Sequence, residues 1–445
     1  MISRLQQSIT FKVLGIGVLA LLMLIPLGHV QGLIFERNGL REKALADIAQ
    51  RWGTAQDIGG PVLAIPKRTH VRVNDTWTTQ ESTEILLADQ LVFQAKISPQ
   101  VRKYGIYSTP VYEAEIAMSG RFLARDLRAL GAAASEAQGS TDEGFLFQRA
   151  ELRLPVADVR GIRRISALRI DDAEYTFGPS NLGSSSSGAG VLRTISLPID
   201  VSKWMDEAHE FKLDLTLAGT ASLHFLPVAR HTEAGITAPW PNPSFNGAFL
   251  PAEHNVSPQG FDARWQVLDL NRSYGQHWQE EARPVDAASA AFGVSLYQPA
   301  DLYQRNERAG KYGVLFISLT FVAFFLFEVL KRLRVHPVQY LLVGLALTTF
   351  YVVLLAFSEQ IGFAFAYIFA ATAVVLLVGG YAAAVLRAKR AGWMLAGMLA
   401  FVYALLYGLV VSEQYSLMMG AIALLVVVAA LMFLTRKVDW YTYSV

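Results

Sequence analysis

Six long apolar segments constrain the fold of this 445-residue chain more than any other feature of its sequence. The first segment begins at Phe11, and the other five follow Lys311. A helix needs roughly 20 mostly apolar residues to cross the hydrocarbon core of a bilayer, and each segment is about that long. The sequence therefore predicts an α-helical membrane protein with six transmembrane helices, at residues 11–30, 312–330, 338–357, 361–386, 393–411 and 416–434.

The first segment can be read as a membrane anchor or as a cleaved signal peptide. It carries no charge after Lys12, which suits both readings. Its end, Leu27-Gly28-His29-Val30-Gln31-Gly32, lacks the small-x-small pattern that signal peptidases cleave. The sequence favours an uncleaved signal anchor.

The charges of the short loops predict the orientation of the chain. Residues 331–334 and 387–390 are rich in Lys and Arg, whereas residues 358–360 and 412–415 each carry one carboxylate and no basic residue. Because short basic loops stay on the cytoplasmic side, both termini are expected in the cytoplasm. We predict four parts in a bacterial inner membrane: a cytoplasmic N-terminus and signal anchor at 1–31, a periplasmic domain at 32–311, a five-helix bundle at 312–434 and a cytoplasmic tail at 435–445.

The predicted periplasmic domain reads as mostly β-structure after one helix. In residues 35–52, apolar side chains recur every four residues from Leu40 to Trp52 and predict a helix with one apolar stripe. Beyond it, apolar and polar residues alternate, as expected for short strands with one buried face. This spacing predicts one or two antiparallel sheets packed as a sandwich, in one lobe or two. The alternating segments are 90–97, 112–118, 150–154, 168–170, 191–197, 211–217 and 221–226, and surface loops are expected at 132–144 and 178–190.

The composition excludes several kinds of chemistry. The chain has no Cys, so disulfides, thiolate metal sites and thiol nucleophiles are ruled out. Its net charge of +2 is too small to indicate nucleic acid as a partner. The sequence contains no phosphate-binding Gly loop, no Gly-x-Ser-x-Gly and no His-Glu-x-x-His. It therefore nominates no catalytic residue, no cofactor and no metal ligand, although a zinc site assembled from distant histidines stays open.

A carboxylate near the inner end of the second predicted span is a candidate for function, because burying a charge in a membrane is costly. Glu328 precedes Lys331 and Arg332 by three and four residues, where a helix brings side chains together. An ion pair at the interface is thus the alternative to a proton or substrate site. His336, at the turn that follows, is a second candidate whose position needs no function.

Two further carboxylates, Glu359 and Glu413, each lie in a Ser-Glu-Gln tripeptide at the outer tip of a predicted membrane hairpin. Both hairpins start and end inside, which suggests a parallel internal repeat of the kind that recurs in transporters. The alternative is that a short outer turn simply needs polar residues.

The segment at residues 239–247 is unusually rich in proline and aromatic residues. Its prolines stiffen an extended path, while Trp240 and Phe245 offer large apolar faces. The segment predicts either a loop packed onto a sheet or part of a binding groove.

Several stretches of the chain resemble the CreD family of bacterial inner-membrane proteins, often labelled cell envelope integrity proteins. The resemblance rests on residues 324–332 (FFLFEVLKR), 335–344 (VHPVQYLLVG) and 357–363 (FSEQIGF), and on 60–66, 245–251 and 308–313. It also includes residues 260–265 (GFDARW), which adds Trp265 to the candidates. The resemblance implies a Gram-negative inner-membrane protein tied to the CreBC two-component system, envelope stress and the β-lactam response. It implies no reaction.

Taken together, these patterns favour a protein that supports envelope integrity by non-catalytic binding through its periplasmic domain. The expected partners are the lipid bilayer and an envelope protein or peptidoglycan-related component, and the oligomeric state is open. A transporter or lipid-handling bundle is the alternative. An envelope hydrolase is the third hypothesis, for which the sequence nominates no acid pair or nucleophile.

Overall fold

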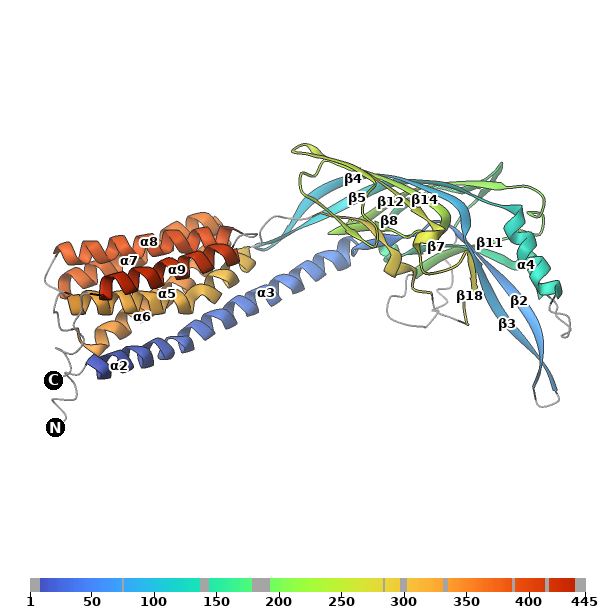
Figure 1. The fold of residues 1–445 in the computed structure, drawn as a ribbon. Helices are drawn as coiled ribbons and strands as arrows, with labels where there is room; N and C mark the ends of the chain where they lie inside the picture. Colours follow the sequence, from blue (N-terminus) through green and yellow to red (C-terminus); the bar gives the residue numbers. More distant parts are fainter. Residues whose placement is uncertain are drawn as a thin grey trace. The chain divides into compact units, whose positions relative to one another are not determined.

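The computed structural model describes residues 9–73, 76–136, 144–177, 193–282, 285–296, 302–330, 335–385, 389–412 and 416–436. The chain divides into a helical unit, Met1–Glu42 with Ala300–Val445, and a β-rich unit, Lys43–Pro299 (Figure 1). This division falls inside the predicted 32–311 domain, because helices continue past the ends of the apolar runs at both junctions. The membrane boundaries themselves remain predictions.

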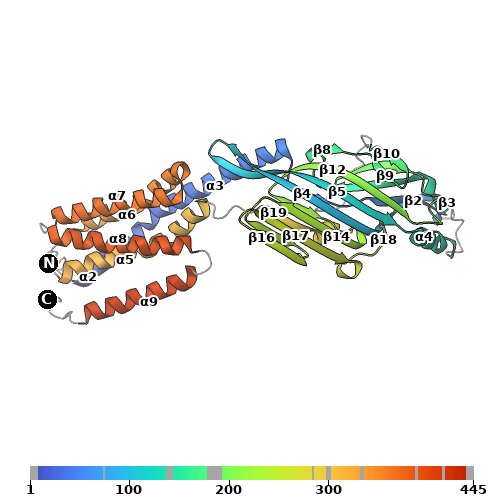
Figure 2. The same cartoon turned by 90° about the horizontal axis from the view of Figure 1, so that it is seen from above.

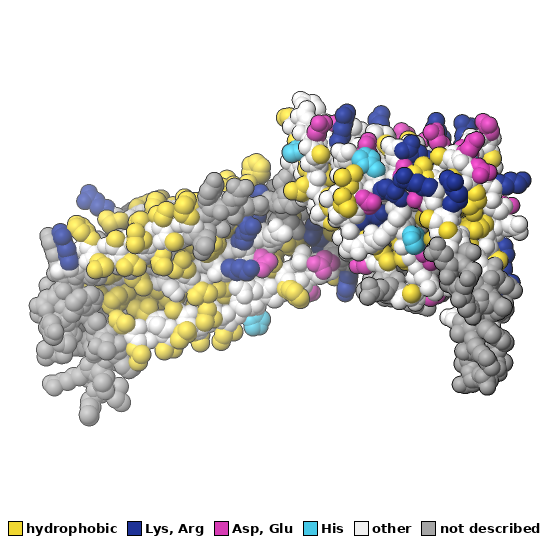
Figure 3. Space-filling view, turned by 45° about the vertical axis from the view of Figure 1, so that its right-hand side comes forward, with side chains coloured by type: hydrophobic (Ala, Val, Ile, Leu, Met, Phe, Trp, Pro, Cys, Tyr) yellow, Lys and Arg dark blue, Asp and Glu magenta, His cyan; other side chains and the backbone are white. Residues whose placement is uncertain are grey.

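The helical unit contains five helices that are long and apolar enough to cross a membrane, among the residues described. Hydrophobic side chains gather over this unit, whereas charged side chains gather over the β-rich unit (Figure 3). The sixth predicted span, 416–434, coincides with helix α9, and its crossing of a membrane stays a prediction. The helices are α2 (Ile9–Leu22), α3 (Leu24–Trp52), α5 (Leu302–Leu330), α6 (Pro337–Ile361), α7 (Phe363–Val385), α8 (Lys389–Val411) and α9 (Ser416–Thr435).

Small and aromatic residues bring the helices of this unit together. A Cβ added at Gly379 in α7 would lie 2.7 Å from the Ala396 Cβ in α8, so the glycine permits a close approach of the two helices. The Phe350 ring lies with its centroid 5.3 Å from that of Tyr367 and 4.6 Å from that of Tyr403. Helices α6, α7 and α8 therefore share one packed aromatic core.

The β-rich unit contains two sheets, seen from above in Figure 2. The ten-stranded sheet runs β15 (Pro243–Gly247), β19 (Phe292–Leu296), β13 (Ser222–Phe225), β1 (Gln56–Ile58), β7 (Ala150–Val156), β2 (Val62–Val73), β3 (Thr76–Leu86) and β18 (His277–Gln279), with β11 (Arg193–Ile199) beside β7 and β6 (Gly144–Phe145) beside β2. The nine-stranded sheet runs β10 (Ala173–Tyr175), β9 (Leu168–Ile170), β12 (His209–Thr220), β5 (Tyr107–Phe122), β4 (Ala88–Tyr104), β14 (Ala229–Ala238), β17 (Gly260–Leu268) and β16 (Glu253–Ser257), with β8 (Ile162–Ile165) beside β12.

The strands form where apolar and polar residues alternate, because one face of each sheet covers the core. In β17, the four buried residues Phe261, Ala263, Trp265 and Val267 alternate with exposed ones. The two sheets contribute to one core, in which the rings of Phe93 and Phe225 stack 4.3 Å apart. The predicted β-rich domain is confirmed, as is the predicted helix at 35–52, which lies within α3.

Two details of the sequence prediction need correction. Most strand pairs are antiparallel, but β4 pairs with β14 and β1 with β13 in parallel, so both sheets are mixed. The loop expected at 132–144 is helical in its first part, because helix α4 (Ala124–Glu136) extends to residue 136. Residues 178–190 lie outside the described residues.

Short 3-10 turns occur at Phe147–Arg149, Val159–Gly161, Asp269–Asn271 and Ala287–Ala290.

Candidate functional site

The outer face of the nine-stranded sheet is polar because its strands turn their apolar residues inward. In β4, Phe93, Ala95 and Ile97 are buried, whereas Gln94 and Lys96 are exposed. The neighbouring strands β5, β12 and β17 follow the same alternation. The register of the sheet decides which of these outward side chains become neighbours.

Strand pairing brings outward polar residues into one row across seven strands. Lys96 lies opposite Glu115 of β5 on one side and Thr237 of β14 on the other. Adjacent strands lie roughly 4.8 Å apart, so a row across seven strands spans about 29 Å. From β8 to β16 the row reads Arg164, Thr216, Glu115, Lys96, Thr237, Asp262 and Asn255.

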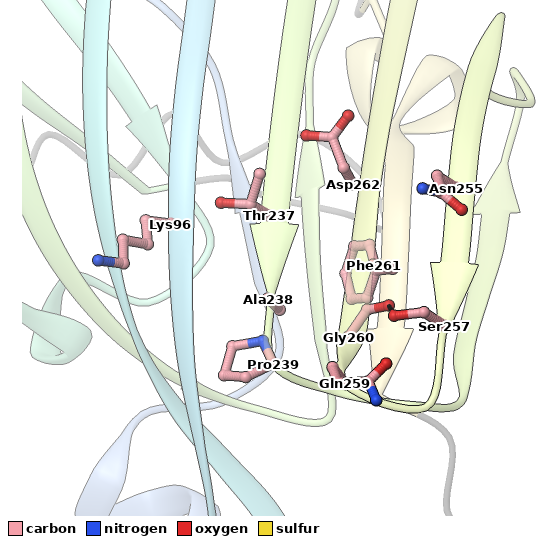
Figure 4. A pocket seen from close by; sticks show the side chains of 10 residues that line it. All are labelled: Lys96, Thr237, Ala238, Pro239, Asn255, Ser257, Gln259, Gly260, Phe261 and Asp262. Carbon is pink, nitrogen blue, oxygen red and sulfur yellow. Dashed lines mark hydrogen bonds between the residues drawn. The ribbon is translucent and has the colours of Figure 1, made fainter.

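Three open hollows of about 440, 560 and 480 Å³ lie on this face and share lining residues. Lys96 and Thr237 line both the first and the third, while Gln94, Ala117 and Asp214 line both the second and the third. The hollows are therefore parts of one surface, which we call the polar face. Figure 4 shows its end at strands β4, β14, β17 and β16.

Two small residues keep the centre of the polar face hollow. Ala117 projects only a methyl group, and Gly235 of β14 has no side chain at all. A Cβ added at Gly235 would lie 2.7 Å from the Oε1 atom of Gln94, so the amide of Gln94 occupies the space beside the glycine. A larger side chain at either position would fill the hollow.

The chemistry of the polar face suits an extended polar ligand. The row carries cations at Arg164 and Lys96, carboxylates at Glu115 and Asp262, and hydroxyl groups at its threonines. These groups donate and accept hydrogen bonds along one line, as a chain of amides or sugar hydroxyls requires.

A second polar cluster lies in the ten-stranded sheet, around His224 of β13. Its Nδ1 lies 2.9 Å from Asp57 Oδ1, and its Nε2 lies 2.8 Å from Asn246 Oδ1. Both ring nitrogens thus face oxygen acceptors, an arrangement that only the charged imidazolium satisfies fully. Burial lowers the pKa of His224, but the hydrogen bonds to Asp57 and Asn246 outweigh it and leave the pKa raised above its ordinary value.

Sequence reasoning missed the pairing of His224 with Asp57, and a second histidine–carboxylate pair, because the partners are distant in the chain. His277 of β18 lies with its Nδ1 atom 2.7 Å from Glu84 Oε1 of β3, and this hydrogen bond raises the pKa of His277. Within the described ranges, no three His, Asp or Glu side chains are grouped so that they could hold a metal ion.

The aromatic candidates lie in and beside the core. Trp265 is 2% exposed, and its Nε1 donates a hydrogen bond to the Phe249 carbonyl at 3.2 Å. Phe245 packs edge-on against Trp265 with ring centroids 5.8 Å apart, and Trp240 is partly buried against the same core. The structure thus brings Phe245 and Trp265 together and makes residues 243–247 a strand, β15, at the edge of the ten-stranded sheet.

Glu328 is buried at the end of α5, with 3% of its surface exposed. Its carboxylate accepts hydrogen bonds from the Val335 N–H at 3.0 Å and from the Tyr340 hydroxyl at 2.9 Å. His336 is exposed and caps α6, because its Nδ1 accepts from the Val338 N–H. The ion-pair partners expected for Glu328 lie in residues 331–334, outside the described residues.

Glu359 belongs to a polar cluster that joins α3, α5 and α6 in the helical unit. The Tyr303 hydroxyl donates to Glu359 Oε1 at 2.9 Å, and Arg37 Nε lies 3.8 Å from the same oxygen. Beside it, the buried Asn306 donates to Ser358 Oγ at 3.0 Å. The Glu359 side chain is only 9% exposed, so this carboxylate is largely withdrawn from solvent. Its predicted counterpart Glu413 lies outside the described residues.

Comparison with known proteins gave matches that cover almost the whole chain. A family model described as "Inner membrane protein CreD" matches residues 8–441. The chain is similar to "Inner membrane protein CreD" of Escherichia coli (strain K12), with 32% identity over 450 residues that cover 99% of this chain and 95% of that protein.

Proposed function

The chain belongs to the CreD family of inner membrane proteins, and on that premise we propose that it supports cell envelope integrity by binding an envelope component, without catalysis, on its polar face. In this proposal six helices cross the inner membrane, both termini are cytoplasmic, and residues 32–311 lie in the periplasm. The charges of the short loops support that orientation. The resemblance to the family supports the link to envelope stress and the β-lactam response.

The observation that carries the proposal is the continuity of the polar face. Hollows that share Lys96, Thr237, Gln94, Ala117 and Asp214 provide one track instead of separate pits. A track about 29 Å long matches a polymer or an extended protein segment better than a small metabolite, whose sites are usually enclosed and mostly apolar. We therefore infer that the ligand is a peptidoglycan strand or an extended segment of an envelope protein.

The experiment places a bulky side chain at the centre of the polar face. Ala117→Trp fills the hollows at an exposed position, so it is expected to abolish binding while the domain still folds. Leu270→Trp is the matched control, because Leu270 is 89% exposed and lines none of the three hollows. In a deletion strain, the control is expected to restore detergent and β-lactam resistance, and Ala117→Trp is not.

Binding is measured directly with isolated peptidoglycan sacculi and with a photo-crosslinking amino acid at Gln94. Adducts with sacculi and adducts with an envelope protein distinguish the two ligand classes. Full rescue by Ala117→Trp at equal expression, together with an absence of adducts from Gln94, would remove the polar face from consideration.

A second candidate function, transport or lipid handling by the helical unit, is favoured by the polar cluster around Glu359. A largely buried carboxylate beside Arg37 and Tyr303 is the kind of group that binds ions or headgroups near a membrane surface. Glu359→Ala combined with Glu413→Ala is expected to abolish rescue if this function is the essential one. Glu307→Ala is the control, because Glu307 is 55% exposed on α5 and pairs only with Lys311 in the ion pairs described. Wild-type behaviour of the double variant would reject this candidate.

A further inference from the structure

One end of the β-rich unit, where helix α4 begins beside the first residues of β4 and β14, gathers basic side chains around two aspartates (Figure 2). The carboxylate of Asp126 lies 3.0 Å from Arg230 Nη2 and 3.8 Å from Arg125 Nε. The carboxylate of Asp89 lies 3.0, 3.6 and 3.7 Å from nitrogen atoms of Arg121, Arg125 and Arg230. Three guanidinium groups thus share two carboxylates.

A fourth arginine, Arg272, adds a buried charge beside this group. Its guanidinium lies 4.7 Å from the centroid of the Tyr274 ring and donates to the Gly275 carbonyl at 3.0 Å and to Gln276 Oε1 at 2.8 Å. Arg272 is only 9% exposed, and within the described ranges it forms no ion pair with a carboxylate. A buried charge without a paired opposite charge is costly. The contacts of Arg272 therefore satisfy hydrogen bonds but leave its charge without a counter-ion.

Gln276 connects Arg272 to the other arginines. Its Nε2 donates to the Ala88 carbonyl at 2.7 Å, and Ala88 pairs with the residue that precedes Arg230 in β14. Burial is the main cause that lowers the pKa of Arg272, and the charge of Arg230 lowers it further, although Asp269 opposes both from beyond ion-pair distance. The positive charges of Arg272 and Arg230 are thus close enough to repel each other.

Both of these arginines also have a donor without an acceptor. In the part of the chain that the structure describes, the Nε atoms of Arg230 and Arg272 are buried and have no hydrogen-bond partner. The group is open on one side, because the side chain of Arg125 is 61% exposed and that of Arg230 is 31% exposed. An oxyanion that enters from this side would bring negative charge and additional acceptors, both of which the group lacks.

We propose that this end of the β-rich unit binds a phosphate group through four arginines, which we call the arginine cluster: Arg121, Arg125, Arg230 and Arg272. Four guanidinium groups face two carboxylates within ion-pair distance, so two positive charges remain. A phosphate monoester carries about 1.5 to 2 negative charges at pH 7, whereas a carboxylate carries only one. Its oxygens also accept paired hydrogen bonds from the planar guanidinium fork.

The two aspartates have a positioning role in this site. Asp89 and Asp126 are each bound by arginines and hold the guanidinium groups in place before the ligand arrives. The site is separate from the polar face, because none of its residues lines the three hollows. A ligand on the polar face and a phosphate at the arginine cluster are therefore independent of each other.

The experiment measures phosphate binding to the full chain in nanodiscs of zwitterionic lipid. Inorganic phosphate replaces chloride at constant ionic strength, and titration calorimetry gives the affinity. Arg272→Gln removes the buried charge and is expected to weaken phosphate binding at least about tenfold. Arg264→Gln is the matched control, because Arg264 is 68% exposed on β17 and lies outside the arginine cluster; it is expected to bind phosphate like wild type.

A second variant keeps the proposal testable if Arg272→Gln does not fold. Arg125 is mostly exposed at the rim, so Arg125→Gln is expected to fold and to weaken phosphate binding by about two- to fivefold. Glycerol 3-phosphate, the polar end of a phospholipid, and glucosamine 1-phosphate, a sugar phosphate, are titrated in the same way. Tighter binding of one ester identifies the source of the phosphate, and equal binding of all three identifies free phosphate.

Two results would overturn the proposal. The first is a wild-type chain that binds none of the three compounds. The second is phosphate binding by folded Arg272→Gln or Arg125→Gln that equals that of wild type and of the Arg264→Gln control.

Discussion

The histidine cluster of the ten-stranded sheet leads to a quantitative prediction about pH and stability. His224→Gln removes the imidazolium that faces Asp57 and Asn246 but keeps an amide of similar reach. A hydrogen bond to a charged group contributes about 1.5–3 kcal/mol, and His224 makes two. The glutamine amide keeps part of one of these hydrogen bonds. Solvent also weakens them, because the side chains of His224 and Asp57 are 19% and 33% exposed. We therefore expect a loss of about 2 kcal/mol at pH 5.5.

The sign of the pH dependence follows from the raised pKa of His224. A raised pKa in the folded state means that protonation favours folding, so the stabilisation is complete below the ordinary value of 6.5 and is lost as pH rises through the folded pKa. The difference between wild type and His224→Gln is therefore expected to be largest below pH 6.5 and to shrink as the pH rises from there toward 9.5.

The assay is pulse proteolysis of the full chain in urea across this pH range, which measures the unfolding free energy of the β-rich unit. His231→Gln is the control, because His231 pairs with Glu233, whose side chain is 47% exposed. Exposed pairs contribute about 0–1 kcal/mol, so the control is expected to change little at any pH. A loss for His224→Gln that is constant, or that grows toward pH 9.5, would refute the assignment of a charged histidine.

Three other substitutions test how the structure is held together. Trp265→Ala is expected to lower the free energy of unfolding by about 3–5 kcal/mol, because it empties a buried site. Trp265→Phe loses mainly the hydrogen bond to Phe249, about 1 kcal/mol. Urea unfolding of the full chain measures both changes, and equal losses would contradict the packing argument. Glu328→Ala leaves the Val335 N–H and the Tyr340 hydroxyl without their acceptor, so it is expected to lower the free energy of unfolding by about 2–4 kcal/mol, and Glu328→Gln by less. Thermal unfolding in nanodiscs compares the two variants. An unchanged midpoint for Glu328→Ala would show that the carboxylate does not stabilise this turn. Gly53→Ala is expected to lower the free energy of unfolding by about 2 kcal/mol or more, because Gly53 has a φ of 135° and a Cβ there would lie 2.6 Å from the Ala218 carbonyl oxygen. A melting temperature equal to that of wild type would refute this.

Local patterns predicted part of this fold, because a half-buried strand or helix carries its own period. The alternation of residues 90–97 identifies the inward-facing set of Leu91, Phe93, Ala95 and Ile97 without any knowledge of neighbours. Strands β14 and β17 and the three-residue strands β1 and β18 were not predicted, although the equally short β9 at 168–170 was. Helix α4 was not predicted, and its second half, from Ala132 to Glu136, was taken for a surface loop because of its composition.

The candidate site depends on register, which local patterns do not contain. Lys96 and Thr237 are neighbours because β4 and β14 pair in parallel, and nothing in either strand alone specifies that partner. The same limitation hid the contact of His224 with Asp57, which requires the pairing of β1 with β13. Glu359 was singled out from the sequence, but its partner Arg37 lies on a helix far away in the chain.

The parallel pairing of β4 with β14 also determines when the polar face can exist during synthesis. The chain reaches Ala88 long before Ala229, and at 5–20 residues per second this interval is on the order of 10 s. During it, the β4 edge presents unpaired backbone groups that other chains could join. Its partner β14 follows β12 in the chain, and β12 pairs with β5 on the opposite side of β4. The domain is thus expected to be a slow folder that needs protection from aggregation while its sheet remains half built.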